Sequence, residues 1–503
     1  MSGKPHRDDA MDDAHLEDEE EEAMLDEGEA EETIEEDDNG DAAMDSGDDD
    51  EGEHEEIELV NDSTAHFDKH KDSIFCIAQH PLHAEVVATG GGDDVAYVWD
   101  ATPPERPLLP SSYETNPQPR ERKGQEVIAT LDGQDESVNA ICFTLPKGEY
   151  VVTATLAGLL SAYATPTAPS TAHKVGTAKE VEEINWLLPC PHASHPNIVA
   201  LGATDGSVWI YTIEPSSITI VQTFFLHQAS CTAGAWSPDG KLLATVAEDS
   251  SLYVWDAFGD AAAAGVTNPS SGQAVVALTA ADERFAVEGG LYSVAISPGG
   301  GIVAVGGAGG NIRVVGLPRF TPASSASASA KPSSARSKAP AGKAAAKSST
   351  ATASTGQMGT ILASLQAQSD GVETLSFSQP PLTLLAAGSV DGSIALFDAA
   401  HNFTVRRNIR EAHDDDAVIK VEFLKGGSAE RNALLTSCGN DGVVRRWDVR
   451  GGTAAANRGL VGEWRGHRGG GEGGGVLGFV QGGGGNAIVT AGDDGIGLVF
   501  RAD

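Results

Sequence analysis

A short unit recurs along most of this chain: an aspartate in a tight turn is followed six residues later by an aromatic residue. The turns separate short runs rich in Val, Ile, Leu, Thr, Tyr and Trp, and such runs between Gly, Asp and Pro clusters predict β-strands. The six matching pairs are Asp93 and Trp99, Asp205 and Tyr211, Asp249 and Trp255, Asp391 and Phe397, Asp441 and Trp447, and Asp494 and Phe500. We therefore expect a series of similar β-units.

Two further segments keep the strand–turn–strand pattern without the aspartate. They are "LAGLLSAY" around Gly158 and "GGAGGNIRVVG" around Gly309. No segment shows a long helical periodicity, so the sequence predicts an all-β fold of eight units.

Histidines at the head of several units, and "VWDA" or "RWDV" at the tail of others, make the units resemble the blades of WD-repeat proteins. The resemblance covers nearly everything from residue 57 to 503 and implies a β-propeller of eight four-stranded blades. In WD-repeat proteins a His, a Ser or Thr, the turn Asp and a Trp form a hydrogen-bonded chain that locks a blade. By resemblance, this blade-locking role falls on His70, Thr89, Asp93 and Trp99, on His227, Thr245, Asp249 and Trp255, and on His413, Ser437, Asp441 and Trp447.

A fourth such set, His467, Thr490 and Asp494, ends in Phe500, which has no hydrogen-bond donor, so we expect its chain to be incomplete. A propeller must also close. The lone β-run "IELVN" at residues 57–61 is expected to pair with the last blade, which would remove two free sheet edges.

Two segments differ in composition from the repeats. Residues 1–56 hold 28 acidic residues against only Lys4 and Arg7, and so much self-repulsion with so few apolar side chains predicts a disordered acidic arm. Residues 321–356 are rich in Ala, Ser and Lys and predict a disordered insertion between two strands. The domain prediction is therefore an arm at 1–56 and a propeller at 57–503 that carries this insertion.

The net charge of −41 makes direct nucleic-acid binding a poor expectation and favours a basic protein partner. The five scattered cysteines form no paired ligand motif, so neither a disulfide framework nor a metal or cofactor site is predicted. No apolar run approaches the ~18 residues that span a bilayer, so no membrane contact is expected. We expect a monomer in the cytoplasm, with a nuclear location left open.

The recurring His, Asp and Ser or Thr residues are the types found in a hydrolase triad. However, the same trio recurs in three blades, whereas catalysis needs one preorganised set in one pocket. The glycine clusters match no GxxxxGK[ST] phosphate loop and open no helix. We therefore predict that the protein is not an enzyme.

Chain order predicts one acidic face. In a propeller, the loops that lead from a fourth strand to the next first strand, and from a second to a third strand, emerge on the same face. The candidate partner-binding acids on this face are Asp135, Glu136, Glu182, Glu183, Glu288, Asp370, Glu373, Asp414, Asp415 and Asp416. The first-to-second loops of the other face hold acids and bases that cancel: Glu85, Glu149, Asp239 and Glu430 against Lys147, Lys241, Lys425 and Arg431.

Three of these acids, Glu182, Glu183 and Glu373, are expected just inside first strands, near the channel mouth where WD-repeat proteins usually contact partners. Neighbouring Phe75, Trp186 and Tyr292 have two interpretations. They are either core residues, or aromatic faces at the mouth that contact a Lys or Arg of a partner.

The chain resembles one WD-repeat family more closely, the group that contains angio-associated migratory cell protein and its fungal counterpart, the dedicated chaperone of a large-subunit ribosomal protein. The resemblance lies in the acidic arm and in "SIFCIAQHP", "EEINWLLPCP", "VETLSFS" and "LLTSCGNDGVVRRWD". It implies a chaperone that captures a basic ribosomal protein and delivers it to pre-60S particles. A signalling or cell-migration scaffold and a histone-binding chaperone remain alternatives. The insertion and "GHRGGGEGGG" depart from the family pattern.

Overall fold

The computed structural model describes residues 60–103, 123–166, 172–266, 274–321, 352–354, 356–451, 459–469, 473–482 and 484–502. All of these belong to one compact unit, Glu58–Asp503. The acidic arm at 1–56 and most of the insertion at 321–356 lie outside the described residues. Both therefore stay predictions.

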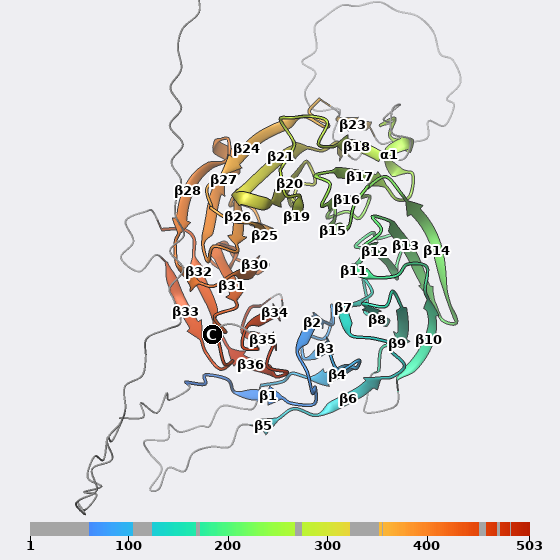
Figure 1. The fold of residues 1–503 in the computed structure, drawn as a ribbon, viewed down its shortest axis with the longest axis vertical. Helices are drawn as coiled ribbons and strands as arrows, with labels where there is room; N and C mark the ends of the chain where they lie inside the picture. The colour runs from blue at the N-terminus through green and yellow to red at the C-terminus, as the bar shows by residue number, and fades with distance from the viewer. Residues whose placement is uncertain are drawn as a thin grey trace, which may run out of the picture. The chain divides into compact units, whose positions relative to one another are not determined.

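Eight four-stranded antiparallel blades form a ring, and the first strand of each blade lies nearest the centre (Figure 1). Blade 1 contains β2 (Ile74–Gln79), β3 (Val86–Gly91), β4 (Ala96–Asp100) and β6 (Val127–Leu131). Blade 2 contains β7 (Val138–Phe143), β8 (Tyr150–Thr155), β9 (Leu160–Ala164) and β10 (His173–Ala178). Blade 3 contains β11 (Ile184–Pro189), β12 (Ile198–Ala203), β13 (Val208–Glu214) and β14 (Ser217–Phe224). Blade 4 contains β15 (Cys231–Trp236), β16 (Leu242–Ala247), β17 (Leu252–Asp256) and β18 (Ala274–Leu278).

The second half of the ring repeats the arrangement. Blade 5 contains β19 (Leu291–Ile296), β20 (Ile302–Gly307), β21 (Asn311–Gly316) and β24 (Ile361–Gln366). Blade 6 contains β25 (Val372–Phe377), β26 (Leu384–Ser389), β27 (Ile394–Asp398) and β28 (Thr404–Ile409). Blade 7 contains β30 (Val418–Phe423), β31 (Leu434–Gly439), β32 (Val444–Asp448) and β33 (Leu460–Trp464). Blade 8 contains β34 (Val476–Val480), β35 (Ala487–Gly492), β36 (Gly497–Arg501) and β1 (Ala65–Phe67).

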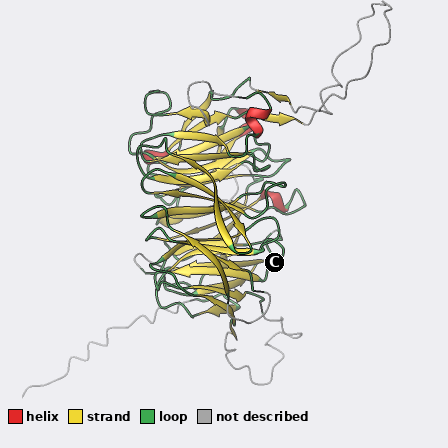
Figure 2. Cartoon of the chain, turned by 90° about the vertical axis from the view of Figure 1, so that its right-hand side faces the viewer, coloured by secondary structure: helices red, strands yellow, loops and turns green. Residues whose placement is uncertain are grey.

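The remaining elements are short and lie in the connections. They are β5 (Lys123–Gly124), α1 (Asp260–Ala263), the hairpin of β22 (Arg319–Thr321) and β23 (Thr352–Ser354), β29 (Ala412–Asp415), and the 3₁₀ turns Ala308–Gly310, Ala399–His401 and Arg431–Ala433. Seen edge on, the strands run across the ring and the loops gather on its two faces (Figure 2). The predicted all-β propeller of eight blades is confirmed.

The strand that closes the ring lies further along the chain than predicted. It is β1, which pairs antiparallel with β36 so that Ala65 faces Val499 and Phe67 faces Gly497. The expected run at 57–61 is wrong in position. Of that run the structure describes only Val60, which is largely exposed, and Asn61. The physical reason is packing, because Phe67 is fully buried and stacks on Trp99 with ring centroids 4.6 Å apart.

Polar side chains join neighbouring blades around the centre. Near the start of a first strand, a side chain donates to the carbonyl of the first residue in the next blade's first strand. Thr232 donates to Leu291 (2.6 Å) and Ser293 donates to Val372 (2.6 Å). The same link runs from Cys76 to Val138 (3.3 Å), from Asn139 to Ile184 (2.5 Å) and from Asn185 to Cys231 (2.9 Å). These bonds hold the first strands in register with one another, and so fix the loops at both faces.

Candidate protein-binding face

The blade-locking residues position the turns of this face. In blade 1 the indole of Trp99 donates to Thr89 Oγ1 (3.2 Å), which lies 3.0 Å from His70 Nε2. His70 Nδ1 lies 3.0 Å from Asp93 Oδ1, and because a carboxylate only accepts, the imidazole donates there. Blade 7 repeats the chain through Trp447, Ser437, His413 and Asp441, with distances of 2.9, 2.8 and 2.9 Å.

Blade 4 differs from the arrangement implied by resemblance. His227 contacts Thr245 (2.8 Å) as expected, but its Nδ1 lies 2.5 Å from Ser251 Oγ rather than against Asp249. Ser251 then donates to Asp249, which also accepts from the backbone N–H of Gln228 (2.7 Å). A serine two residues after the turn aspartate is what inserts this extra step. Burial lowers the pKa of His227 to about 4.

In two blades a glutamine occupies the place of the histidine. This replacement was not predicted from the sequence. Gln134 accepts from Thr153 (3.1 Å) and donates to the hydroxyl of Tyr163 (3.0 Å) in blade 2. Gln368 donates to Ser393 Oγ (3.1 Å) in blade 6. The sequence does contain a pattern that indicates this role, because "GQDESV" and "AQSDGV" place a glutamine just before a first strand.

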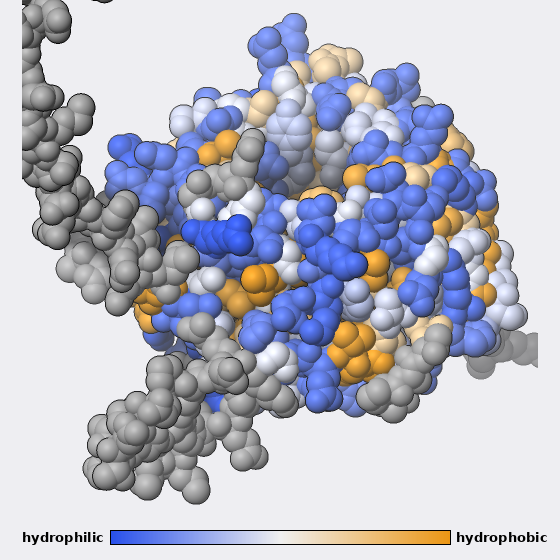
Figure 3. All heavy atoms as spheres, turned by 60° about the horizontal axis from the view of Figure 1, so that its bottom comes forward, coloured by the Kyte–Doolittle hydropathy of each residue, from blue (hydrophilic) through white to orange (hydrophobic). Residues whose placement is uncertain are grey.

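Charge separates sharply between the two faces in the part of the chain that the structure describes. The connections on the first face carry 25 Asp and Glu against 7 Lys and Arg, whereas those on the opposite face carry 7 of each sign. Without the six turn aspartates that follow the second strands, the acids of the first face still outnumber its bases. Figure 3 shows hydrophilic side chains over much of the surface, with small apolar patches between them. We call the first face the acidic face.

Near the centre of this face, acids cluster around an aromatic ring. Tyr292 on β19 is half-buried, and its pKa is raised by burial and by the charges of Glu248 and Glu373. Glu373 is exposed at the surface. Neighbouring groups still remove part of its hydration, and this desolvation, together with the charge of Asp370, raises the pKa of Glu373. Asp370 and Glu373 repel each other, and among the described residues neither forms an ion pair with a Lys, Arg or His. A cation placed between them would relieve that repulsion.

Two other predicted residues lie differently from expectation. Glu182 and Glu183 stand in the turn before β11, which begins at Ile184, so the prediction that they lie inside a first strand is wrong. Glu182 is exposed and Glu183 is half-buried. Both still belong to the acidic face, because the connection from β10 to β11 emerges there.

The three candidate aromatic residues have different environments. Trp186 is buried, and its indole donates to the carbonyl of Cys231 (3.1 Å), so it is a core residue and not part of the mouth. Phe75 is 38% exposed beside Gly92. Phe75 and Tyr292 are therefore the two of the three that a partner can reach.

Several other predicted acids already have partners. Asp135 accepts from Lys179 (2.7 Å) and from Thr155 (2.9 Å), while Asp414 lies 3.8 Å from Arg445. Glu136, Glu288, Asp370 and Asp415 are exposed, and Asp416 is half-buried. The acids of the face are thus unequal, and the exposed ones are better placed to meet a partner.

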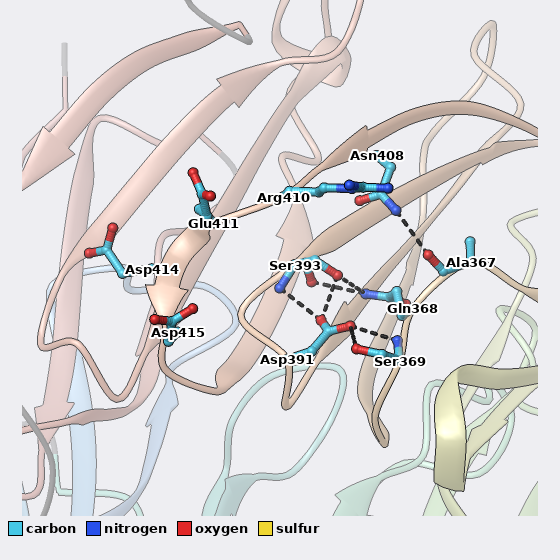
Figure 4. A pocket seen from close by; sticks show the side chains of 10 residues that line it. All are labelled: Ala367, Gln368, Ser369, Asp391, Ser393, Asn408, Arg410, Glu411, Asp414 and Asp415. Carbon is cyan, nitrogen blue, oxygen red and sulfur yellow. Dashed lines mark hydrogen bonds between the residues drawn. The ribbon is translucent and has the colours of Figure 1, made fainter.

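A polar pocket of about 540 Å³ lies beside blade 6 on this face, lined by residues that include Gln368, Asp391, Arg410 and Asp415. Figure 4 shows Asp391 held by Ser369 and Ser393, with Glu411, Asp414 and Asp415 apart from that group. Because Asp391 accepts four hydrogen bonds from those two serines, its carboxylate serves the turn rather than a ligand.

The described residues contain no group of three or more His, Cys, Asp or Glu that could hold a metal ion. No helix among them is long and apolar enough to cross a membrane.

Residues 61–100, 218–256 and 359–398 match the family model "WD domain, G-beta repeat". The ribosome assembly protein SQT1 of Saccharomyces cerevisiae is 27% identical over 89% of this chain and 88% of its own length. The human angio-associated migratory cell protein is 24% identical over 82% of this chain and 74% of its own length.

Two solved structures are also similar to this chain. The crystal structure of Chaetomium thermophilum Sqt1 is 48% identical, covers 88% of this chain and 98% of its own, and superposes with a TM-score of 0.73. A structure of the same protein bound to the N-terminus of the ribosomal protein L10 covers 88% of this chain and 100% of its own, at 48% identity and a TM-score of 0.72. The chain therefore belongs to the WD-repeat family of Sqt1 and angio-associated migratory cell protein.

Proposed function

We propose that this protein is a ribosome-assembly chaperone that holds a basic N-terminal segment of ribosomal protein L10 on its acidic face and delivers L10 to pre-60S particles. The observation that carries the proposal is the separation of charge between the two faces. It is supported by the Chaetomium Sqt1 structure, whose bound partner is the N-terminus of L10. No catalytic step is part of the proposal, and we place the protein in the cytoplasm.

The acidic face would act in two ways. Its long-range field attracts a basic segment and speeds encounter, an effect that falls with added salt. At the centre, Glu373 and Tyr292 then offer a carboxylate and an aromatic face to a Lys or Arg side chain. Shielding the basic segment would keep it from stray RNA, and ribosomal RNA would displace the chaperone at the assembly site.

The test is capture of L10 by the full-length protein, followed by elution with a salt gradient. Immobilised protein is offered an equimolar mixture of L10 from the same organism and core histones. We expect L10 to be retained and to elute as salt rises, because exposed charge pairs are screened. Retention of histones without L10 would favour a histone chaperone, and retention of neither would remove the basic-client proposal.

A further inference from the structure

Exposed apolar side chains gather on the outer strand of blade 3 and at its end on the acidic face. They are Ile220, Val221, Phe225 and Leu226, within seven residues of one another in the chain. Phe225 is the most exposed of the four, at 62%. It directly follows β14 and lies two residues before the buried His227, so its backbone is tied to the blade at both ends.

Phe225 forms a corner with a second aromatic ring. Its ring and that of Trp209 on β13 have centroids 5.8 Å apart and planes at 85°. Trp209 is half-buried and stacks on Tyr211, with centroids 6.2 Å apart, which holds the indole in place. The corner thus combines a ring held in place with the ring of Phe225, which is exposed enough to present a π face to a ligand.

Carboxylates border this corner. The indole N–H of Trp209 donates to Ser207 Oγ (2.8 Å), and Ser207 donates through its hydroxyl (2.5 Å) and its backbone N–H (2.8 Å) to Asp205 Oδ1. Asp205 is exposed and is thereby held near the edge of the indole. Both of these hydrogen bonds end on Oδ1, and Oδ2 accepts none from the described residues.

Glu180 is an exposed acidic residue of the connection between β10 and β11, which emerges on the same face. Burial raises the pKa of the Tyr211 hydroxyl, and the charge of Glu180 raises it further. Lys179, the neighbouring base, is bonded to Asp135 at 2.7 Å and so does not offset Glu180. The corner is therefore aromatic inside and acidic at its rim.

This chemistry selects a basic side chain. The face of an aromatic ring attracts a cation, and Arg in particular stacks on such faces while its guanidinium donates to carboxylates. The apolar stem of Arg or Lys can at the same time cover a ring such as Phe225. A purely apolar ligand would make no use of the second carboxylate oxygen of Asp205, because Ser207 bonds only to Oδ1.

We propose that Trp209, Phe225 and Asp205 form a second subsite on the acidic face, which binds an Arg or Lys side chain of the client's basic segment. The identity of the client rests on the function proposed above. The central cluster around Glu373 and this rim subsite would then hold two points of one segment. Two contacts on one chain strengthen binding because the second forms within an existing complex.

The experiment measures the dissociation constant of full-length L10 for the full-length protein and its variants by fluorescence anisotropy. We expect Phe225→Ala to weaken binding about three- to tenfold. Phe225→Leu keeps the apolar contact but loses the π face, so it should bind nearly as weakly, whereas Phe225→Tyr should bind like the unaltered protein. Ile220→Ala is the matched control, because it removes an exposed apolar side chain of the same blade outside the corner.

The outcomes separate the two proposals. If the unaltered protein binds L10 and Phe225→Ala binds equally well, the subsite is overturned and the proposed function stands. If Phe225→Leu binds like the unaltered protein, the ligand is apolar and the cationic assignment is overturned. If the unaltered protein does not bind L10, the proposed function fails. A tetra-arginine peptide is then the probe, and equal affinity for the unaltered protein and Phe225→Ala would overturn the subsite as well.

Discussion

Single residues decide how completely each blade is locked. In blade 6 the hydroxyl position of the second strand is taken by Ala387 and the tryptophan position of the third by Phe397. The side-chain oxygen of Gln368 therefore lacks a hydrogen-bond donor: Oε1 is buried without a partner among the described residues. A buried unpaired carbonyl costs stability, so blade 6 should be weaker than blades 1 and 7.

Restoring the missing hydroxyl tests this explanation. We expect Ala387→Ser to give Gln368 Oε1 a donor and to stabilise the protein by about 1 kcal/mol, seen as a higher midpoint in urea unfolding. Ala386→Ser is the control: both alanines are buried in apolar clusters, but Gln368 contacts only Ala387 of the two (3.2 Å from Nε2 to the carbonyl oxygen), so a hydroxyl at 386 should destabilise. An unchanged or lower midpoint for Ala387→Ser would contradict the account.

The buried histidines predict a loss of stability in acid. Burial lowers the pKa of His227 to about 4 from an ordinary value of 6.5, so its neutral form is favoured by folding. The stability that this provides is complete above pH 6.5 and is lost as the pH falls towards 4, because the unfolded chain takes up the proton first.

Glutamine already serves this position in blades 2 and 6, so His227→Gln is a tolerable change without a titrating group. We expect its melting temperature to fall less between pH 6.5 and pH 4 than that of the unaltered protein. The exposed His173 supplies the control, and His173→Gln should follow the unaltered curve. Parallel curves for His227→Gln and the unaltered protein would count against the proposed titration.

At the scale of elements, closure depends on the short strand β1. It pairs antiparallel with β36 on one side, and on the other it pairs in parallel with β5, which belongs to the connection between β4 and β6. The backbone N–H of Gln125 adds a bond to the carbonyl of His66 (2.8 Å). The connection between β4 and β6 of blade 1 thus covers the outer edge of β1, the strand that completes blade 8.

The position of this strand gives a direct comparison. Phe67→Ala should destabilise the protein by about 3–5 kcal/mol, because a fully buried ring stacked on Trp99 is lost. Val60→Ala should have almost no effect, because Val60 is 59% exposed. Equilibrium unfolding in denaturant measures both. Equal losses for the two variants would mean that the run containing Val60 shares in closure.

The sequence predicted most of the elements but not all of their partners. The Asp-to-aromatic spacing located six blades, because each turn and its strands are local in the chain. Closure could not be placed the same way: β1 pairs with β36 more than 400 residues away, and an alternation such as "IELVN" is as strand-like as "AHF". The aromatic corner at Trp209 and Phe225 was also missed, since it joins a third strand to a loop across the edge of a blade.

At the scale of the whole molecule, the ring sorts charge because its topology assigns alternate connections to opposite faces. The acidic residues of the first face are contributed by connections of several blades, so no single loop provides the field. Such a field acts over about a Debye length, near 8 Å in physiological salt, and attracts a basic chain before any contact forms. Individual contacts at the centre and the rim would then fix its position.

The most direct measurement compares two triple variants with the same change in net charge. One carries Glu182→Lys, Glu183→Lys and Glu373→Lys on the acidic face, and the other carries Glu85→Lys, Glu126→Lys and Glu430→Lys on the opposite face, where all three side chains are exposed. The dissociation constant of L10 is measured for both at two salt concentrations. We predict that the first variant weakens binding at least tenfold and loses most of its salt dependence, while the second stays within about threefold of the unaltered protein. Equal weakening by the two variants would contradict the claim that one face of the ring binds the client.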